Sequence, residues 1–129
     1  MGKKHSPLFL RRVEHSRTFI NECTIEEFLS MLSDTEPLIV IDVREAHEFE
    51  SGYMKGATHI GKGVLERDIE KHPFDVNDRI VLYCGGGFRS AIAAQSLQEM
   101  GYGNVFSLWG GWRSIVAEGL EITTINSPD

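Results

Sequence analysis

Two continuous apolar runs constrain the fold of this chain more than any other feature. The segments "PLIVIDV" (residues 37–43) and "DRIVLYC" (residues 78–84) are rich in β-branched residues and lack the polar alternation of a half-exposed strand. Such a strand is usually covered on both faces, as in a parallel sheet. A helix-like segment closed by a glycine follows each run. This alternation predicts an α/β domain.

Weaker patterns complete the expected sheet and its helices. Shorter strands are expected at residues 18–20, 56–60 and 104–108. Thr24 and Glu27 have the spacing of a capping box, which starts a helix. Further helices are expected at residues 45–52, 64–70, 90–100 and 112–118. The order predicts a mostly parallel five-stranded sheet flanked by helices on both faces.

One domain accounts for nearly the whole chain. Its 129 residues, 41% of them hydrophobic, can bury a single core of ordinary size. No internal repeat or low-complexity linker interrupts the pattern. We therefore expect an N-terminal extension over residues 1–16, the folded domain over residues 17–120 and a C-terminal tail over residues 121–129.

Charge and hydropathy argue against nucleic acids and membranes as binding partners of this chain. Thirteen Lys and Arg against nineteen Asp and Glu give a net charge of −6, which disfavours a surface built to neutralise nucleic-acid phosphates. The apolar runs are far shorter than the roughly twenty residues that cross a bilayer, and no secretory signal pattern opens the sequence. We expect a cytoplasmic protein with no nucleic-acid or membrane partner.

The cysteines and histidines do not form a metal-site pattern. Cys23 and Cys84 are far apart in the sequence, and the five histidines include no HxxH or HxxxH pair. We therefore expect free thiols, no metal and no cofactor. Cys23 precedes the capping box, where a small apolar side chain has a packing role.

The stretch "YCGGGFRS" places a cysteine beside three glycines. Cys84 ends the second apolar run, at the sheet edge where open α/β domains bind ligands. Gly85, Gly86 and Gly87 can turn successive backbone N–H groups inward and form an anion-binding nest. A helix that starts near Ser90 adds the positive end of its dipole. Both effects favour the Cys84 thiolate, the nucleophilic form.

Arg89 adds a fixed positive charge to this loop. A guanidinium can donate two hydrogen bonds to an oxyanion, so Arg89 could orient an anionic substrate. The alternative is an ordinary glycine-rich turn around a buried, inert cysteine. The coincidence of these features at one strand end favours a functional site.

Three motifs lie in order along the chain: "DVREAHEF" (residues 42–49), "YCGGGFRSAIAA" (residues 83–94) and "LWGGW" (residues 108–112). They resemble the single-domain rhodaneses, a family of sulfurtransferases, from about residue 18 to residue 119. The resemblance implies a rhodanese-like fold and a persulfide mechanism. In it, the Cys84 thiolate takes the outer sulfur of a small anionic donor such as thiosulfate, releases sulfite, and passes the sulfur to cyanide, a thiol or a protein cysteine.

The resemblance also implies which residues hold the persulfide, namely Gly85, Gly86, Gly87, Phe88, Arg89 and Ser90. One stretch departs from the family, because Tyr53 and Met54 stand where His and Ile are usual. This departure concerns the framework more than the chemistry.

Two alternatives remain for the function. Phosphatases related to this fold use a C-x5-R loop, but only four residues separate Cys84 from Arg89. No aspartate general acid is recognisable either, so a phosphatase is less favoured. A non-catalytic rhodanese-like binding or regulatory module is the other alternative, and in that case Cys84 would be dispensable.

Asp42 and Arg44 end the first apolar run and should lie at the same sheet edge as Cys84. The resemblance suggests that they form an ion-pair network that braces the active loop. Direct contact with the substrate is the alternative. Trp109, Gly110 and Gly111 are expected to form a tight turn beside the site.

Overall fold

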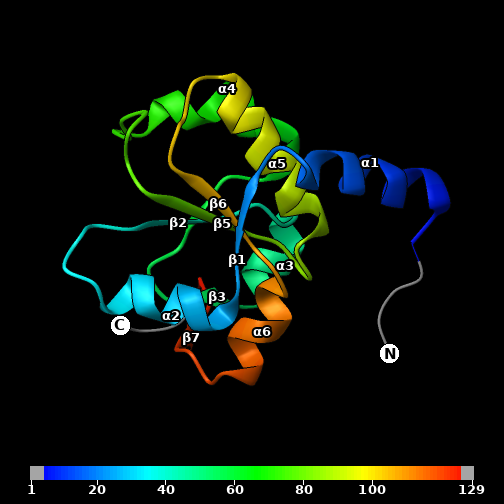
Figure 1. Cartoon of the computed structure of the whole chain (residues 1–129). Coiled ribbons are helices and arrows are strands. Elements are labelled where there is room, and N and C mark those ends of the chain that lie inside the picture. Colours follow the sequence, from blue (N-terminus) through cyan, green and yellow to red (C-terminus); the bar gives the residue numbers. More distant parts are fainter. Residues whose placement is uncertain (1–4, 126–129) are drawn as a thin grey trace.

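A five-stranded sheet forms the centre of the computed structural model, which describes residues 5–125 (Figure 1). Every neighbouring pair of strands is parallel. The expected fold class is confirmed. Along the sheet, the strands are β1 (Asn21–Cys23), β6 (Val105–Leu108), β5 (Ile80–Tyr83), β2 (Ile39–Asp42) and β4 (Thr58–His59).

Helices cover both faces of this sheet (Figure 1). One face carries α4 (Leu65–Asp68) and α5 (Phe88–Glu99), and the other carries α2 (Ile25–Ser33) and α6 (Gly111–Ala117). Short 3₁₀ turns at Lys62–Val64 and Ile69–Lys71 flank α4, and α3 (Ala46–Ser51) follows β2.

Alternate side chains of the central strands enter two separate cores, because neighbouring residues of a strand point to opposite faces. Under α4 and α5 lie Ile41, Ile80, Leu82 and Val105. Under α2 and α6 lie Val40, Val81, Tyr83 and Leu108. Both faces of β2 and β5 are therefore buried, which explains why the two strands are apolar except for Asp42 at the end of β2.

Segments near both ends of the described chain pack on this domain. Helix α1 (Pro7–Arg17) lies against α5, with Val13 buried and Ser16 Oγ donating to Gln95 Oε1 at 2.7 Å. Strand β7 (Ile122–Thr123) pairs antiparallel with β3 (Tyr53–Met54). The segments expected as an extension and a tail thus contribute one helix and one strand.

Two local expectations were wrong. The first strand is at Asn21–Cys23 rather than at residues 18–20. The backbone N–H groups of Thr18 and Phe19 instead donate to His15 O and Ser16 O, and so they close α1. Helix α5 begins at Phe88, earlier than the expected start near Ser90, because a glycine provides its N-cap. The capping box of Thr24 and Glu27 is present as expected.

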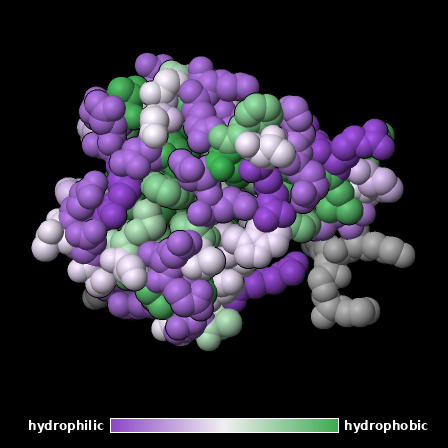
Figure 2. Space-filling view, viewed as in Figure 1, coloured by the Kyte–Doolittle hydropathy of each residue, from purple (hydrophilic) through white to green (hydrophobic). Residues whose placement is uncertain are grey.

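The surface of the described residues is mixed in character. The face seen in Figure 2 is largely hydrophilic, with apolar side chains scattered between charged ones. No helix within residues 5–125 combines the length and the hydropathy needed to cross a bilayer.

A buried ion pair lies at the end of β2. The carboxylate of Asp42 is fully buried and Arg44 is 4% exposed. Arg44 Nη2 donates to Asp42 Oδ2 at 2.7 Å and to the carbonyl oxygen of Gly52 at 2.7 Å. The Arg44 guanidinium also lies 4.2 Å from the ring centroid of Trp112. The pair therefore joins β2 to α6 and to the segment that follows α3.

The Asp42→Ala variant should lower the free energy of unfolding by about 3–5 kcal/mol, because Arg44 keeps its charge but loses the buried partner. Urea denaturation followed by circular dichroism measures this loss. Glu121→Ala is the matched control, since it removes a carboxylate that pairs with Lys55 at 3.2 Å on the exposed surface. Its cost should stay below about 1 kcal/mol. Equal losses in the two variants would contradict the structural role of the buried pair.

Candidate active site

Cys84 lies directly after β5, at the carboxyl edge of the sheet. It is only 1% exposed, yet it lines a pocket. Its Sγ accepts hydrogen bonds from the backbone N–H groups of Gly87, at 3.2 Å, and Ser90, at 3.3 Å. Ser90 Oγ lies 3.5 Å from the same sulfur and 2.8 Å from Ser107 Oγ. Two backbone N–H groups thus point at the sulfur.

The carbonyl groups of the active loop (residues 84–90) bond to the turn that follows β6. Three hydrogen bonds, which we call the loop clamp, run from Trp112 N to Cys84 O at 2.7 Å, from Arg113 N to Gly85 O at 3.2 Å and from Gly110 N to Gly86 O at 3.0 Å. A Cβ atom on Gly111, whose φ is +46°, would collide with Cys84 O. The clamp therefore requires a glycine at position 111.

Position 87, like position 111, requires a glycine. It is the N-cap of α5 with φ of +108°, a value that L side chains rarely adopt. A Cβ atom there would lie 3.2 Å from Leu108 O. The left-handed turn at Gly87 leads directly into α5, whose first turn contributes the Ser90 N–H to the sulfur. Of the amide nest expected around Cys84, these two N–H groups are the ones that reach Sγ.

Arg89 is paired with Glu48 of α3. Its Nη1 donates to Glu48 Oε2 at 2.8 Å, and its Nη2 donates to Oε1 at 3.2 Å. These hydrogen bonds are the main cause that lowers the pKa of Glu48 to about 2. The same bonds raise the pKa of Arg89, and the nearby Cys84 contributes less. Glu48 belongs to the "DVREAHEF" motif, but its pairing with Arg89, 41 residues later, was not predicted from the sequence.

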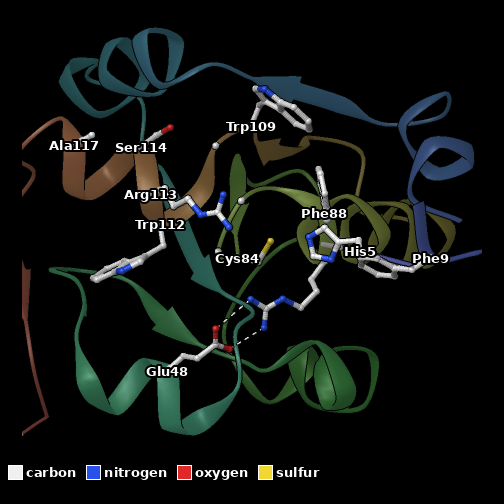
Figure 3. A pocket seen from close by; sticks show the side chains of 14 residues that line it. His5, Phe9, Glu48, Cys84, Phe88, Trp109, Trp112, Arg113, Ser114 and Ala117 are labelled. Atoms are coloured by element: carbon white, nitrogen blue, oxygen red, sulfur yellow. Dashed lines mark hydrogen bonds and ion pairs between the residues drawn. The ribbon is translucent and has the colours of Figure 1, made fainter. Parts of the chain in front are cut away.

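A pocket of about 970 Å³ opens in front of Cys84 (Figure 3). The residues expected at the site that line it are Cys84, Gly85, Gly86, Phe88 and Arg89. Gly87 and Ser90 instead contribute backbone N–H groups to the sulfur. Several lining residues were not predicted from the sequence, namely His5, Phe9, Glu48, Trp112, Arg113, Ser114 and Ala117.

Aromatic rings form one side of this pocket. The Phe88 ring lies between Trp109, at 5.8 Å between centroids, and His5, at 4.8 Å. Phe9 of α1 packs on His5 at 5.2 Å. The segment that leads into α1 therefore contributes to the pocket wall, and only the tertiary packing of α1 on α5 brings it there.

Asp42 and Arg44 do not line the pocket. They lie behind the loop clamp, because Arg44 contacts Trp112 and the Trp112 N–H bonds to Cys84 O. This position favours the bracing role over contact with the substrate.

The other cysteine has a different environment. Cys23 is 3% exposed, and burial is the main cause that raises its pKa to about 12. Among residues 5–125, no three His, Cys, Asp or Glu side chains gather in a way that could hold a metal ion.

Comparisons with known proteins agree on one family. The family model of the rhodanese-like domain matches residues 24–118. The putative sulfur carrier protein YrkF of Bacillus subtilis is 33% identical over 109 residues, a match that covers 81% of this chain but only 58% of that protein. A sulfurtransferase of Allochromatium vinosum is 31% identical over 103 residues, which are 80% of this chain and 94% of the relative.

A solved structure shares the fold over nearly the full length. It is a protein of unknown function from Rhodopseudomonas palustris, described as a possible tyrosine phosphatase, with a TM-score of 0.77 and 24% identity. The superposition covers 95% of this chain and 99% of that one. At this identity the likeness concerns the fold alone. The family match over residues 24–118, together with the two relatives, establishes that this chain belongs to the rhodanese-like domain family.

Proposed function

We propose that this protein is a sulfurtransferase that carries sulfane sulfur on Cys84. The most direct support is the position of Cys84. Its Sγ accepts hydrogen bonds from two backbone N–H groups, and the residue lines a pocket of about 970 Å³. Relatives described as a sulfurtransferase and as a putative sulfur carrier support the same chemistry. The donor is a small anion such as thiosulfate, and the acceptor is cyanide, a small thiol or a protein cysteine.

The first half-reaction forms the persulfide. The Cys84 thiolate attacks the outer sulfur of thiosulfate, so that a new S–S bond forms as the old one breaks. The bonding electron pair leaves with sulfite, and the negative charge of the thiolate passes to the outer sulfur of the persulfide. The N–H groups of Gly87 and Ser90 hold Cys84 Sγ in position for the attack.

The second half-reaction returns the enzyme to its thiolate form. Cyanide or an acceptor thiolate attacks the outer sulfur, and the Cys84–sulfur bond breaks with its electron pair on Sγ. The products are thiocyanate or a persulfide of the acceptor. Neither half-reaction needs an external oxidant or reductant, because the sulfane sulfur keeps its oxidation state.

The phosphatase alternative has less support. The loop clamp ties down a loop that has one residue fewer than a C-x5-R loop between Cys84 and Arg89. The Arg89 guanidinium is also paired with Glu48. Hydrolysis of an aryl phosphate should therefore stay at the background rate.

Incubation with thiosulfate should increase the intact mass of the protein by one sulfur atom. Mass spectrometry under native conditions measures the gain. Cys84→Ser should abolish it, because the attacking thiolate is gone. Cys23→Ala is the matched control and should keep the full gain. A protein that gains no sulfur from thiosulfate or from any other sulfane donor would contradict the proposed function.

Iodoacetamide at neutral pH should modify Cys84 in preference to Cys23. Burial and the pKa of about 12 keep Cys23 protonated and out of reach, whereas Cys84 lines the open pocket. Peptide mapping after timed labelling measures both rates, and labelling in denaturant shows that both peptides are detected. Faster labelling of Cys23 in the folded protein would contradict the assignment of the nucleophile.

The ion pair of Glu48 and Arg89 should stabilise the fold in a pH-dependent way. The pKa of Glu48 is lowered from 4.5 to about 2, so its contribution is complete above about pH 4.5 and is lost as the pH falls through 2. Glu48→Gln should therefore be less stable than the parent near neutral pH, and the difference should narrow between pH 4.5 and 2.

Chemical denaturation at a series of pH values measures this difference. Glu66→Gln is the control, because it removes a charge from the exposed side of α4. It should change stability by less than about 0.5 kcal/mol at neutral pH. A gap between parent and Glu48→Gln that stays constant down to pH 2 would show that the ion pair does not contribute.

A further inference from the structure

The pocket contains two arginines in different electrostatic situations. Arg89 is neutralised by Glu48 at 2.8 Å. Arg113 of α6 also lines the pocket, and no carboxylate within residues 5–125 forms an ion pair with it. The charged side chains of the lining are Arg89, Arg113 and Glu48, and His5 adds an imidazole. Arg113 thus carries the one positive charge of the described pocket that has no paired counter-charge.

The position of Arg113 is fixed by the loop clamp. Its backbone N–H donates to Gly85 O at 3.2 Å, which ties the residue to the active loop. Its side chain then extends over the loop, where a Cβ atom on Gly86 would lie 4.0 Å from Arg113 Cζ. Figure 3 shows the Arg113 guanidinium pointing into the pocket near Cys84, with Glu48 on the other side of Cys84.

We propose that Arg113 is the anion-binding residue of this pocket and receives the oxyanion end of the sulfur donor. This inference rests on the proposed function. A thiosulfate dianion presents three oxygens at one end and the transferable sulfur at the other. With its oxygens hydrogen-bonded to Arg113, its outer sulfur faces Cys84 Sγ for attack.

The same contact helps the bond to break. As the S–S bond of thiosulfate breaks, the electron pair passes to the departing sulfite, and negative charge grows at the end that Arg113 holds. A fixed guanidinium beside developing charge lowers the barrier. The protein therefore favours sulfane donors with an anionic oxyacid leaving group. A net charge of −6 strengthens the need for a local cation, because the chain as a whole repels anions.

Two alkylating reagents of similar size test the anion site without sulfur chemistry. Iodoacetate carries a carboxylate and iodoacetamide is neutral, but both alkylate the Cys84 thiolate. Arg113→Gln should lower the rate with iodoacetate by about tenfold, the effect of losing one charge-assisted hydrogen bond. The rate with iodoacetamide should stay within about twofold, because no charged contact is lost. Arg113→Lys should lie in between, since it keeps the charge but not the two-pronged geometry.

Thiosulfate turnover supplies the second readout. In Arg113→Gln, kcat/KM for thiosulfate should fall by about tenfold or more. Arg67→Gln is the matched control, because it removes the same charge from exposed α4 on the opposite face of the sheet. It should leave both alkylation rates and turnover unchanged.

The outcomes separate this inference from the proposed function. If the parent protein takes sulfur from thiosulfate but Arg113→Gln alters neither turnover nor the ratio of the two alkylation rates, Arg113 is not the anion site. If the parent takes no sulfur from any donor but the ratio falls in Arg113→Gln, the anion site stands and the sulfurtransferase proposal fails. An equal fall of both alkylation rates would indicate a general loss of Cys84 reactivity and would overturn the role of Arg113 in anion binding.

Discussion

The loop clamp sets the direction of the backbone groups around Cys84. Because the carbonyl oxygens of residues 84–86 bond to N–H groups at the start of α6, they are turned toward α6. The N–H groups of Gly87 and Ser90 can then point at the sulfur. A peptide loop cannot direct its donors inward without placing its acceptors elsewhere. The "LWGGW" motif meets this requirement from a distant part of the sequence.

Behind the clamp, a buried charge network holds the motif in place. Arg44 is neutralised by Asp42 at the end of β2, and its guanidinium lies against the Trp112 ring. The Trp112 backbone in turn donates to Cys84 O. One chain of contacts therefore runs from β2 through Trp112 to Cys84. Cys84, the proposed nucleophile, directly follows a strand at the centre of the sheet, and sites built on such elements are more precise than sites on loops.

The features that local sequence determines were predicted well. The strands β2 and β5 and the loop after Cys84 could be predicted, because a strand covered on both faces is mostly apolar and a tight turn needs glycines. Glu48, Arg113 and His5 were not, because each reaches the pocket only through tertiary packing of α3, α6 or the segment before α1. The sequence indicated that Arg89 brings a positive charge to the loop, but it did not indicate that Glu48 pairs with that charge. Whether a charged side chain is free to bind a ligand depends on neighbours that are distant in the sequence.

The aromatic wall of the pocket has a practical consequence for handling the protein. His5 and Phe9 place the beginning of the described chain at the entrance to Cys84. An affinity tag or fusion partner inserted directly before His5 would lie beside that entrance and would obstruct substrates. Strand β7 contributes no residue to the lining within residues 5–125. An insertion after β7 is therefore better suited to kinetic work than one before His5.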